Sequence, residues 1–372
     1  MSALLPGSAG SAPQKIVVAG GGIIGASLAY HLAKRGAQVT LCEKEYPAAG
    51  ATGKSFAWIN ATFSKQPRQY HDLNVLGMKG WQHLEAEFSG DLQIQWGGAV
   101  EWQEGAPEAK ALRTDVARAQ DWGYSTRLID LNEFSHLLPL ILPGEFRAAS
   151  FSEREGTLDP VQATQTILEK AKRLGAHVLY PCEVTGLTVS GGRVQAADTS
   201  QGRIPLDAMV VASGVATPRL AALAGVKVPL KDSPGVLAHT APMAPLLDRV
   251  VLGPRAHMKQ NPDGSVVTGT DFRGTPTTDS SRGFGEKLLA SAAQYLLELK
   301  RAKLSQVTLG WRVMPQDEYP ILGFADACPN LYIAATHSGV TLAPVVGEFG
   351  AMEILDGARV EMLAPYRLAR FA

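Results

Sequence analysis

The turn at residues 20–25, with the sequence GGGIIG, constrains the fold of this chain more than any other feature. It satisfies the pattern G-x-G-x-x-G and follows a short apolar stretch, 15–19, that is rich in β-branched residues. Apolar residues then recur at helical spacing over 23–35, and a second apolar stretch occupies 38–43. This order predicts a βαβ unit at the start of the fold.

The glycines of this turn have the roles that a dinucleotide site requires. Gly20 permits the tight turn, Gly22 lets the backbone approach a pyrophosphate, and Gly25 lets the helix pack closely on the strand. The helix N-terminus offers free N–H groups and a partial positive charge to the phosphates. Glu43 ends the second strand, where a carboxylate accepts hydrogen bonds from ribose hydroxyls and repels a 2′-phosphate. The combination favours a dinucleotide-binding turn over a purely structural one. The acidic residue disfavours NADP as the dinucleotide.

Two further features favour FAD over NAD, although both contain adenosine diphosphate. Residues 50–55 form a small, hydroxyl-bearing loop that could hold phosphate and ribityl oxygens. Near the C-terminus, an apolar strand at 331–335 is followed by Gly339 and a helix that runs to about Leu355. The N-terminus of that helix, aimed at a flavin pyrimidine, would stabilise negative charge on the reduced ring. The alternatives are an ordinary loop and ordinary helix packing.

The remainder of the chain departs from this βαβ order and indicates a separate, sheet-rich lobe. Residues 93–103 predict a hairpin around Gly97-Gly98, and 261–264 predict a hairpin turn. The other predicted elements are helices at 73–88, 106–122, 161–174 and 284–302, and strands at 177–180, 183–189, 192–198, 202–205, 209–212, 236–241, 257–260 and 265–269.

Composition excludes several classes of function. The 35 basic and 35 acidic residues cancel and form no basic run, which argues against a nucleic-acid or anionic-membrane surface. Three cysteines without ligand spacing indicate neither a disulfide framework nor a metal site. Residues 1–14 lack the features of a signal peptide, and no segment is apolar enough to span a bilayer, so we expect a cytoplasmic protein.

Motifs along nearly the whole chain point to one family. The sequence resembles the D-amino-acid oxidase superfamily of FAD-dependent oxidoreductases, in particular the glycine oxidase and sarcosine oxidase-like branch. The motifs that carry the resemblance are 20–25 with Glu43-Lys44, 50–52 (GAT), 156–160 (GTLDP), 210–214 (VVASG), 310–315 (GWRVMP), 320–323 (PILG) and 337–344 (HSGVTLAP).

The resemblance implies an α/β fold, α+β overall, in which a Rossmann-type FAD-binding lobe is interrupted by an antiparallel-sheet lobe that binds the substrate. We expect a flexible tail at 1–14. The FAD-binding domain is predicted at 15–80, 151–230 and 305–372, and the substrate-binding domain at 81–150 and 231–304.

The resemblance also implies a reaction. A C–N bond of an amino acid or secondary amine is oxidised by hydride transfer to flavin N5, and the imine is then hydrolysed. Oxygen or another carrier accepts the electrons. The resemblance is compatible with either a homo- or a hetero-oligomer. Two alternatives remain: oxidation of a 2-hydroxy acid, and a flavin-bearing subunit that works within a heteromeric dehydrogenase.

Residues that match the family motifs are expected to bind the cofactor. They include residues at the pyrophosphate, around the adenosine, along the ribityl chain and ring, and at the flavin pyrimidine. The full set is Gly20, Gly22, Ile23, Ile24, Gly25, Glu43, Lys44, Ala51, Thr52, Phe56, Ala57, Trp58, Val184, Gly214, Ser338, Gly339, Val340, Thr341 and Leu342.

Two residues are expected in the substrate site. Arg312 matches the arginine that clamps the substrate carboxylate, a task that suits the planar guanidinium fork. It could instead form an ion pair with Asp317 or Glu318. His337 lies beside the C-terminal glycine and could act in the site, or be a packed histidine.

The chain departs from the family pattern in four places. Val313 stands where relatives often have proline, and only His337-Ser338 precedes Gly339, where glycine oxidases have a longer stretch with a second arginine. Val267 occupies the predicted position of a lysine that promotes reaction with oxygen. Its absence weakens the case for an oxidase, so a dehydrogenase with another electron acceptor remains an alternative. Met314 occupies the position of the flavin-linking cysteine, so we expect non-covalent FAD.

Several nearby residues have simpler interpretations. Lys259 is expected to be a solvated strand residue. Trp58 and Trp311 are expected in the core, although both flank motifs and could instead wall the substrate site. Asp159-Pro160 is interpreted as a helix start.

Overall fold

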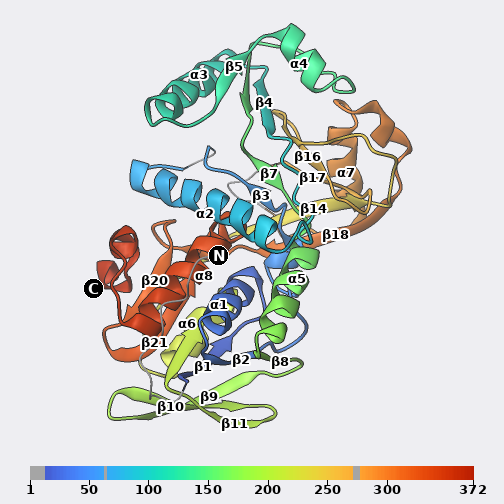
Figure 1. Ribbon diagram of the computed structural model, residues 1–372. Helices are drawn as coiled ribbons and strands as arrows, with labels where there is room; N and C mark the ends of the chain where they lie inside the picture. Colours follow the sequence, from blue (N-terminus) through green and yellow to red (C-terminus); the bar gives the residue numbers. More distant parts are fainter. Residues whose placement is uncertain (1–12, 63–64, 271–276) are drawn as a thin grey trace.

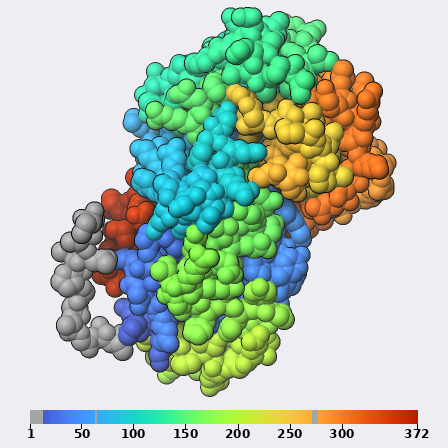
Figure 2. All heavy atoms as spheres, turned by 45° about the vertical axis from the view of Figure 1, so that its right-hand side comes forward, coloured from blue at the N-terminus to red at the C-terminus, as the bar shows by residue number. Residues whose placement is uncertain are grey.

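The computed structural model describes residues 13–62, 65–270 and 277–372 (Figure 1), so nearly all of the expected tail lies outside the described residues. The predicted mixed α/β fold is confirmed. The described residues build two large sheets, one mainly parallel and one mainly antiparallel. In the space-filling view, residues around 110–150 lie at one end of the molecule and residues around 184–205 at the other (Figure 2).

The mainly parallel sheet is built on the predicted βαβ unit. Its six strands run parallel except for β20, which pairs antiparallel with β21. Almost every residue of the central strands is buried, as expected for a parallel sheet covered on both faces. The order is β20 (Ile321–Ala325), β21 (Cys328–Ala335), β12 (Ala208–Val211), β1 (Lys15–Ala19), β2 (Gln38–Cys42) and β8 (His177–Leu179).

Helices pack on one face of this sheet, and the predicted meander packs on the other. Figure 1 shows the helices stacked side by side. The helices α1 (Ile23–Lys34), α5 (Pro160–Arg173) and α8 (Gly339–Asp356) contact its strands, and α2 (Arg68–Glu87) packs against α8. The second face carries α6 (Thr217–Ala222) and the strands β9 (Val184–Ser190), β10 (Arg193–Thr199) and β11 (Gly202–Pro205).

The second sheet has eight strands, which are antiparallel except where β15 runs parallel to β4. Their order is β18 (Leu304–Trp311), β14 (Pro234–Thr240), β17 (Val266–Gly269), β16 (His257–Gln260), β15 (Val250–Leu252), β4 (Ala99–Gln103), β6 (Ala148–Ser152) and β5 (Arg127–Ile129). It carries α3 (Ala106–Asp121), α4 (Leu131–Leu137) and α7 (Arg282–Ala292). The expected domain boundary at residue 305 thus falls inside β18.

Short elements connect the two sheets. The strand β3 (Trp58–Ile59) pairs with β7 (Gly156–Thr157), and β13 (Leu230–Lys231) pairs with β19 (Met314–Pro315). The 3₁₀ turns are η1 (Thr52–Lys54), η2 (Gly214–Ala216), η3 (Leu297–Arg301), η4 (Glu361–Tyr366) and η5 (Leu368–Phe371).

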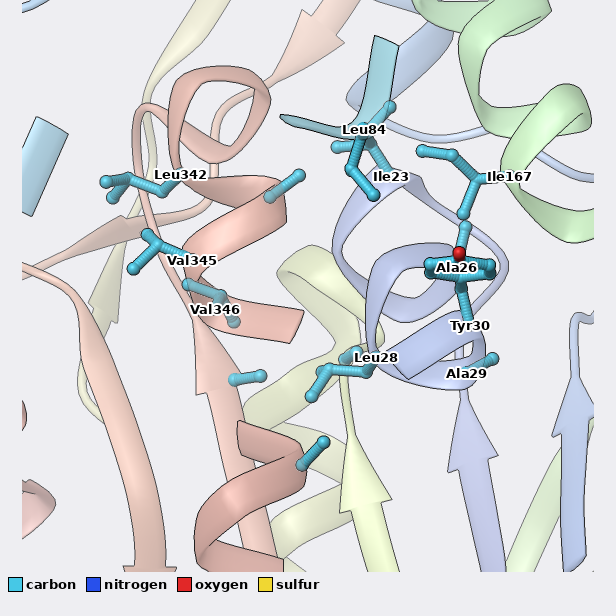
Figure 3. Packing of buried hydrophobic residues seen from close by; sticks show 14 of the residues in the cluster. Ile23, Ala26, Leu28, Ala29, Tyr30, Leu84, Ile167, Leu342, Val345 and Val346 are labelled. Atoms are coloured by element: carbon cyan, nitrogen blue, oxygen red, sulfur yellow. The ribbon is translucent and has the colours of Figure 1, made fainter. Parts of the chain in front are cut away.

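Helix α8 packs unusually closely against its neighbours because glycines stand at both contacts. A Cβ on Gly77 of α2 would overlap the carbonyl oxygen of Thr341, and one on Gly347 of α8 would overlap the Ser27 hydroxyl of α1. Leu342 and Val346 of α8 belong to the same buried cluster as residues of α1, α2 and α5 (Figure 3). The N-terminus of α8 is therefore held in one place relative to the parallel sheet.

The predicted hairpin at 93–103 is wrong. Only β4 forms there, and the residues before it pair with another segment, since Gln95 exchanges backbone hydrogen bonds with Thr157 and the Gly98 N–H donates to the Glu155 carbonyl. Residues on both sides of Gly97-Gly98 thus pair with the 148–157 segment rather than with each other.

Two predicted helices have different bounds. The helix expected from residue 73 already begins at Arg68, directly after Pro67. The helix expected over 284–302 ends at Ala292, and η3 follows separately. The Tyr295 carbonyl accepts from Leu142 N–H at 2.8 Å, so it serves the antiparallel lobe instead of a further helical turn.

Replacement of Gly77 by alanine should separate α2 from α8 and lower the free energy of unfolding by about 1–3 kcal/mol, because the new methyl group has no space. Urea denaturation followed by tryptophan fluorescence measures the change. Gly283→Ala, at an exposed position of α7 without a close neighbour, should be neutral or stabilise by up to about 1 kcal/mol. Equal denaturation midpoints for Gly77→Ala and the unmodified chain would contradict the proposed helix contact.

Candidate active site

A cavity of about 930 Å³ extends from the β1–α1 turn to the N-terminus of α8. Its walls come from both ends of the chain and from the antiparallel sheet. Gly20 and Glu43 line one part, Val184 lies beside them, and Arg312 and His337 line another part. A long cavity of this size can accommodate a dinucleotide together with a small second molecule.

At the β1–α1 turn, Glu43 is fixed by backbone donors. Its Oε2 accepts from Gly21 N–H at 2.7 Å, and its Oε1 accepts from Glu45 N–H at 3.0 Å. A Cβ on Gly25 would overlap the Gly20 carbonyl, so the helix approaches the strand as closely as the pattern requires. The turn presents an immobilised carboxylate next to a helix N-terminus.

The loop at 50–55 lies against this turn. The Thr52 hydroxyl accepts from Ile23 N–H at 3.1 Å, which places η1 directly beside the first turn of α1. A Cβ on Gly22 would come within 3.0 Å of the same hydroxyl. The hydroxyl-bearing loop and the glycine turn therefore form one continuous wall of the cavity.

At the C-terminal wall, Ser338 adopts a left-handed backbone conformation with φ 57° and precedes α8. Its hydroxyl accepts from Tyr70 Oη at 3.1 Å and from Lys65 Nζ. His337 Nδ1 lies 3.5 Å from the same hydroxyl. In this wall, Lys65 and Tyr70 therefore both donate to Ser338, which lies far from them in the sequence.

Arg312 lies in the cavity wall contributed by the antiparallel sheet. Its backbone N–H donates to the Ser233 carbonyl at 2.9 Å, and its guanidinium lies over Gly235, where a Cβ would come within 3.0 Å of Nη2. The alternative partners are otherwise engaged, because Asp317 pairs with Arg370 and Glu318 pairs with Lys231. Arg312 thus lines the same cavity as the glycine turn and His337.

The histidines beside these cations stay neutral near pH 7. Burial, with Lys65 and Arg312 nearby, lowers the pKa of His337 to about 3. Burial and Arg312 together lower the pKa of His257 to about 3. Lys65 itself is affected in the same direction, since burial lowers its pKa to about 8 although Glu155 opposes that shift. Positive charge at this wall therefore resides on lysine and arginine rather than on imidazole.

A buried carboxylate holds one aromatic wall of the cavity. Glu155 accepts hydrogen bonds from Trp58 Nε1 at 2.9 Å and from Tyr124 Oη at 2.9 Å, and also from Thr62 and the Ala61 N–H. Burial raises the pKa of Glu155 to about 7. The network fixes the Trp58 indole, which lines the cavity.

The structure brings the expected site residues together with two exceptions. Arg312, His337 and all of the expected cofactor-binding residues except Gly25 and Leu342 line the large cavity. Gly25 packs against Gly20 as described, whereas Leu342 points into the helix cluster and is fully buried (Figure 3). The side chain of Leu342 therefore does not line the cavity, and its expected place beside the flavin stays a prediction.

Other expectations are also corrected. Lys259 is fully buried, not solvated, and its Nζ donates to the Leu158 carbonyl at 2.6 Å. Trp58 is buried as expected, whereas Trp311 is 39% exposed and lies outside the core, and both side chains line the large cavity. Val267 lines a smaller second cavity of about 190 Å³ and belongs to one buried cluster with Phe56 and Trp58, so its expected place over the flavin stays a prediction.

Sequence reasoning missed three residues, Lys65, Tyr70 and Glu155. None belongs to a motif with a known spacing, and each acquires its place through contacts with distant segments. The position of Glu155 directly before the GTLDP motif was the only local signal.

Metal ligands and membrane spans are missing from the described ranges. Among residues 13–62, 65–270 and 277–372, no group of three or more His, Cys, Asp or Glu side chains is placed to hold a metal ion. A helix long and apolar enough to cross a membrane is likewise not found there. Cys42, Cys182 and Cys328 are free and buried.

Comparison with protein families identifies a match over most of the chain. The family profile described as "FAD dependent oxidoreductase", abbreviated DAO, matches residues 15–351. Sarcosine oxidase subunit beta of Rhizobium meliloti (strain 1021) is 24% identical over 375 residues, 96% of this chain and 88% of that protein. Mitochondrial dimethylglycine dehydrogenase of Mus musculus is 24% identical over 92% of this chain, which spans only 42% of that longer protein.

Solved structures show the same fold. L-Proline dehydrogenase from P. horikoshii superimposes with a TM-score of 0.86 and 26% identity over 96% of this chain and 98% of that one. Glycine oxidase from Geobacillus kaustophilus gives a TM-score of 0.87 with 22% identity over 96% and 99% of the two chains. At that identity the second likeness supports the fold alone.

Replacement of His337 by glutamine should change how stability depends on pH. Because the folded pKa is lowered, the unfolded chain binds a proton below about pH 6.5 while the folded protein does not, so stability is lost as pH falls. The variant lacks this loss, and its stability relative to the unmodified apoprotein should rise by up to about 1.4 kcal/mol per pH unit between pH 6 and 4. Urea titrations across this range measure the difference, and a constant difference would argue against a neutral, enclosed imidazole.

Proposed function

The chain belongs to the DAO family of FAD-dependent oxidoreductases, and we propose that it oxidises a C–N bond of a small amino acid or secondary amine that carries a carboxylate. The observation that carries this proposal is the placement of Arg312 in the same cavity as the dinucleotide-type glycine turn. Flavin, substrate carboxylate and reacting carbon can then share one enclosure.

The residues present fit FAD. The glycine turn leaves space for a pyrophosphate, the fixed Glu43 carboxylate can accept hydrogen bonds from the ribose, and the loop with Thr52 supplies a wall for the ribityl chain. Bound FAD supplies the two-electron acceptor of the reaction, a chemistry that the amino acid side chains lack. Since Met314 lines the cavity at the place of the expected linking residue, we propose that FAD is bound non-covalently.

The protein's contribution is to bind and orient the substrate. The Arg312 guanidinium can form two parallel hydrogen bonds with a carboxylate, which sets the position of the neighbouring α-carbon. Phe56 and Trp58 are each only 6% exposed and provide apolar walls that exclude water. The low pKa of His337 makes it a poor proton acceptor near neutral pH, so we assign it a positioning role and not that of a general base.

We propose that the two sheets divide this work as the sequence suggested, with the parallel sheet binding FAD and the antiparallel sheet the substrate. The R. meliloti relative is named as a subunit, which supports a second candidate in which this chain carries flavin within a heteromeric enzyme. The three free, buried cysteines support a reducing compartment, and we propose the cytoplasm.

An anaerobic bleaching screen tests the function directly. Holoprotein is mixed with amino acids, N-methyl amino acids and 2-hydroxy acids while the absorbance of the flavin is followed. We expect bleaching by at least one amine and by none of the hydroxy acids. Faster reduction by a hydroxy acid would select that alternative, and reduction only after addition of a partner subunit would select the heteromeric one. A folded protein that does not take up FAD would contradict the proposed function and both alternatives.

Replacement of Arg312 by methionine should raise KM for a carboxylate substrate by about 10- to 150-fold, the loss expected for one charged hydrogen-bonding partner. Arg312→Lys should retain part of the affinity, because a lysine keeps the charge without the fork. The control is the corresponding amine without a carboxylate, which both variants should oxidise as the unmodified enzyme does. An unchanged KM for the carboxylate substrate in Arg312→Met would remove the clamp assignment.

A further inference from the structure

Lys65 is a charged side chain in the wall of the large cavity to which no family motif assigns a role. It is 6% exposed, and the surface it retains faces the cavity. Its Nζ donates to the Ser338 hydroxyl and lies 5.4 Å from the centre of the Tyr70 ring. These contacts hold the ammonium group in one position, although its backbone lies far from α8 in sequence.

The charge of Lys65 has no carboxylate in contact. Within the described parts of the chain, Nζ forms no salt bridge, and the carboxylate that acts on it electrostatically is Glu155. Both oxygens of Glu155 are already occupied by donors from Trp58, Ala61, Thr62 and Tyr124. A buried cation without a counter-ion costs free energy unless the site receives an anionic group.

The N-terminus of α8 adds positive potential at the same point. Ser338 occupies the N-cap position but makes no side-chain hydrogen bond to the helix, since its hydroxyl is used by Lys65 and Tyr70. Gly339, Val340 and Thr341, the first residues of this 18-residue helix, line the cavity. A full charge and a helix N-terminus therefore converge on one part of the cavity.

We propose that Lys65 is the electrostatic partner of the flavin pyrimidine and stabilises the negative charge that this ring carries when FAD is reduced. The inference rests on the proposed function only in requiring that FAD occupies the cavity with its pyrimidine toward α8. It assigns to Lys65 an effect on the cofactor itself, while the substrate carboxylate is left to Arg312. The residue sets how readily the flavin accepts electrons, whichever amine supplies them.

The test measures the flavin without any substrate. Sulfite adds reversibly to flavin N5 and leaves negative charge on the pyrimidine, so its dissociation constant reports the stabilisation that Lys65 provides. In FAD-loaded Lys65→Met, we expect this constant to rise on the order of tenfold and the two-electron potential to fall by the equivalent, about 30 mV. Lys65→Arg, which keeps the charge, should retain most of the affinity. Lys79→Met, at an exposed lysine on the same helix as Tyr70, is the matched control and should match the unmodified protein.

Three results would overturn the proposal. The first is a Lys65→Met protein that binds FAD and has the sulfite affinity and potential of the unmodified protein. The second is an unchanged potential together with a raised KM for carboxylate substrates, which would place the substrate and not the flavin beside Lys65. The third is an equal loss of sulfite affinity in Lys65→Arg and Lys65→Met, which would indicate a packing defect and not the loss of a charge. If no amine reduces the flavin, the proposed function fails, but the sulfite and potential measurements still decide the role of Lys65.

Discussion

The close contact of α8 with α1 and α2 is the constraint on which the active-site geometry depends. A glycine stands at each of the two interfaces. Because it has no Cβ, the neighbouring helix occupies the space that a methyl group would need. Because the first turn of α8 forms part of the cavity wall, its position fixes Ser338 and the groups that bond to it. The same close approach brings the glycine turn of α1 and the C-terminal helix, which lie at opposite ends of the sequence, into one enclosure.

The electrostatics of the cavity follow from burial more than from net charge. The chain is neutral overall, yet the cavity is lined by Arg312, Lys65 and a helix N-terminus, and the neutral His337 lies near both cations. In the proposed function these positive charges serve two different anionic groups, the substrate carboxylate at Arg312 and the reduced flavin at Lys65. Dry walls formed by Phe56 and Trp58 make each of these charges more effective than it would be in water.

Much of the fold could be predicted from the sequence because its signals are local. The glycine turn, the βαβ unit, the meander and the C-terminal strand–glycine–helix depend on spacing and backbone conformation alone. The wrong predictions concern residues whose pairing or burial is determined by segments far away in the sequence. Residues around Gly97-Gly98 pair with a distant strand, and Lys259 is buried by the approach of Leu158. The expected site residues other than Gly25 and Leu342 line the cavity, whereas Lys65, Tyr70 and Glu155 are defined by partners far along the chain.

The order in which the cavity walls occur along the chain has a consequence for biosynthesis. The walls come from the N-terminal turn, from the middle strands and from residues near 340, so the enclosure does not exist on the ribosome until α8 has emerged. Contacts of such large sequence separation form slowly, and the incomplete chain exposes the apolar surfaces that α8 later covers. A chain that stops before residue 338 therefore lacks one wall of the cavity and cannot enclose a cofactor as the folded protein does.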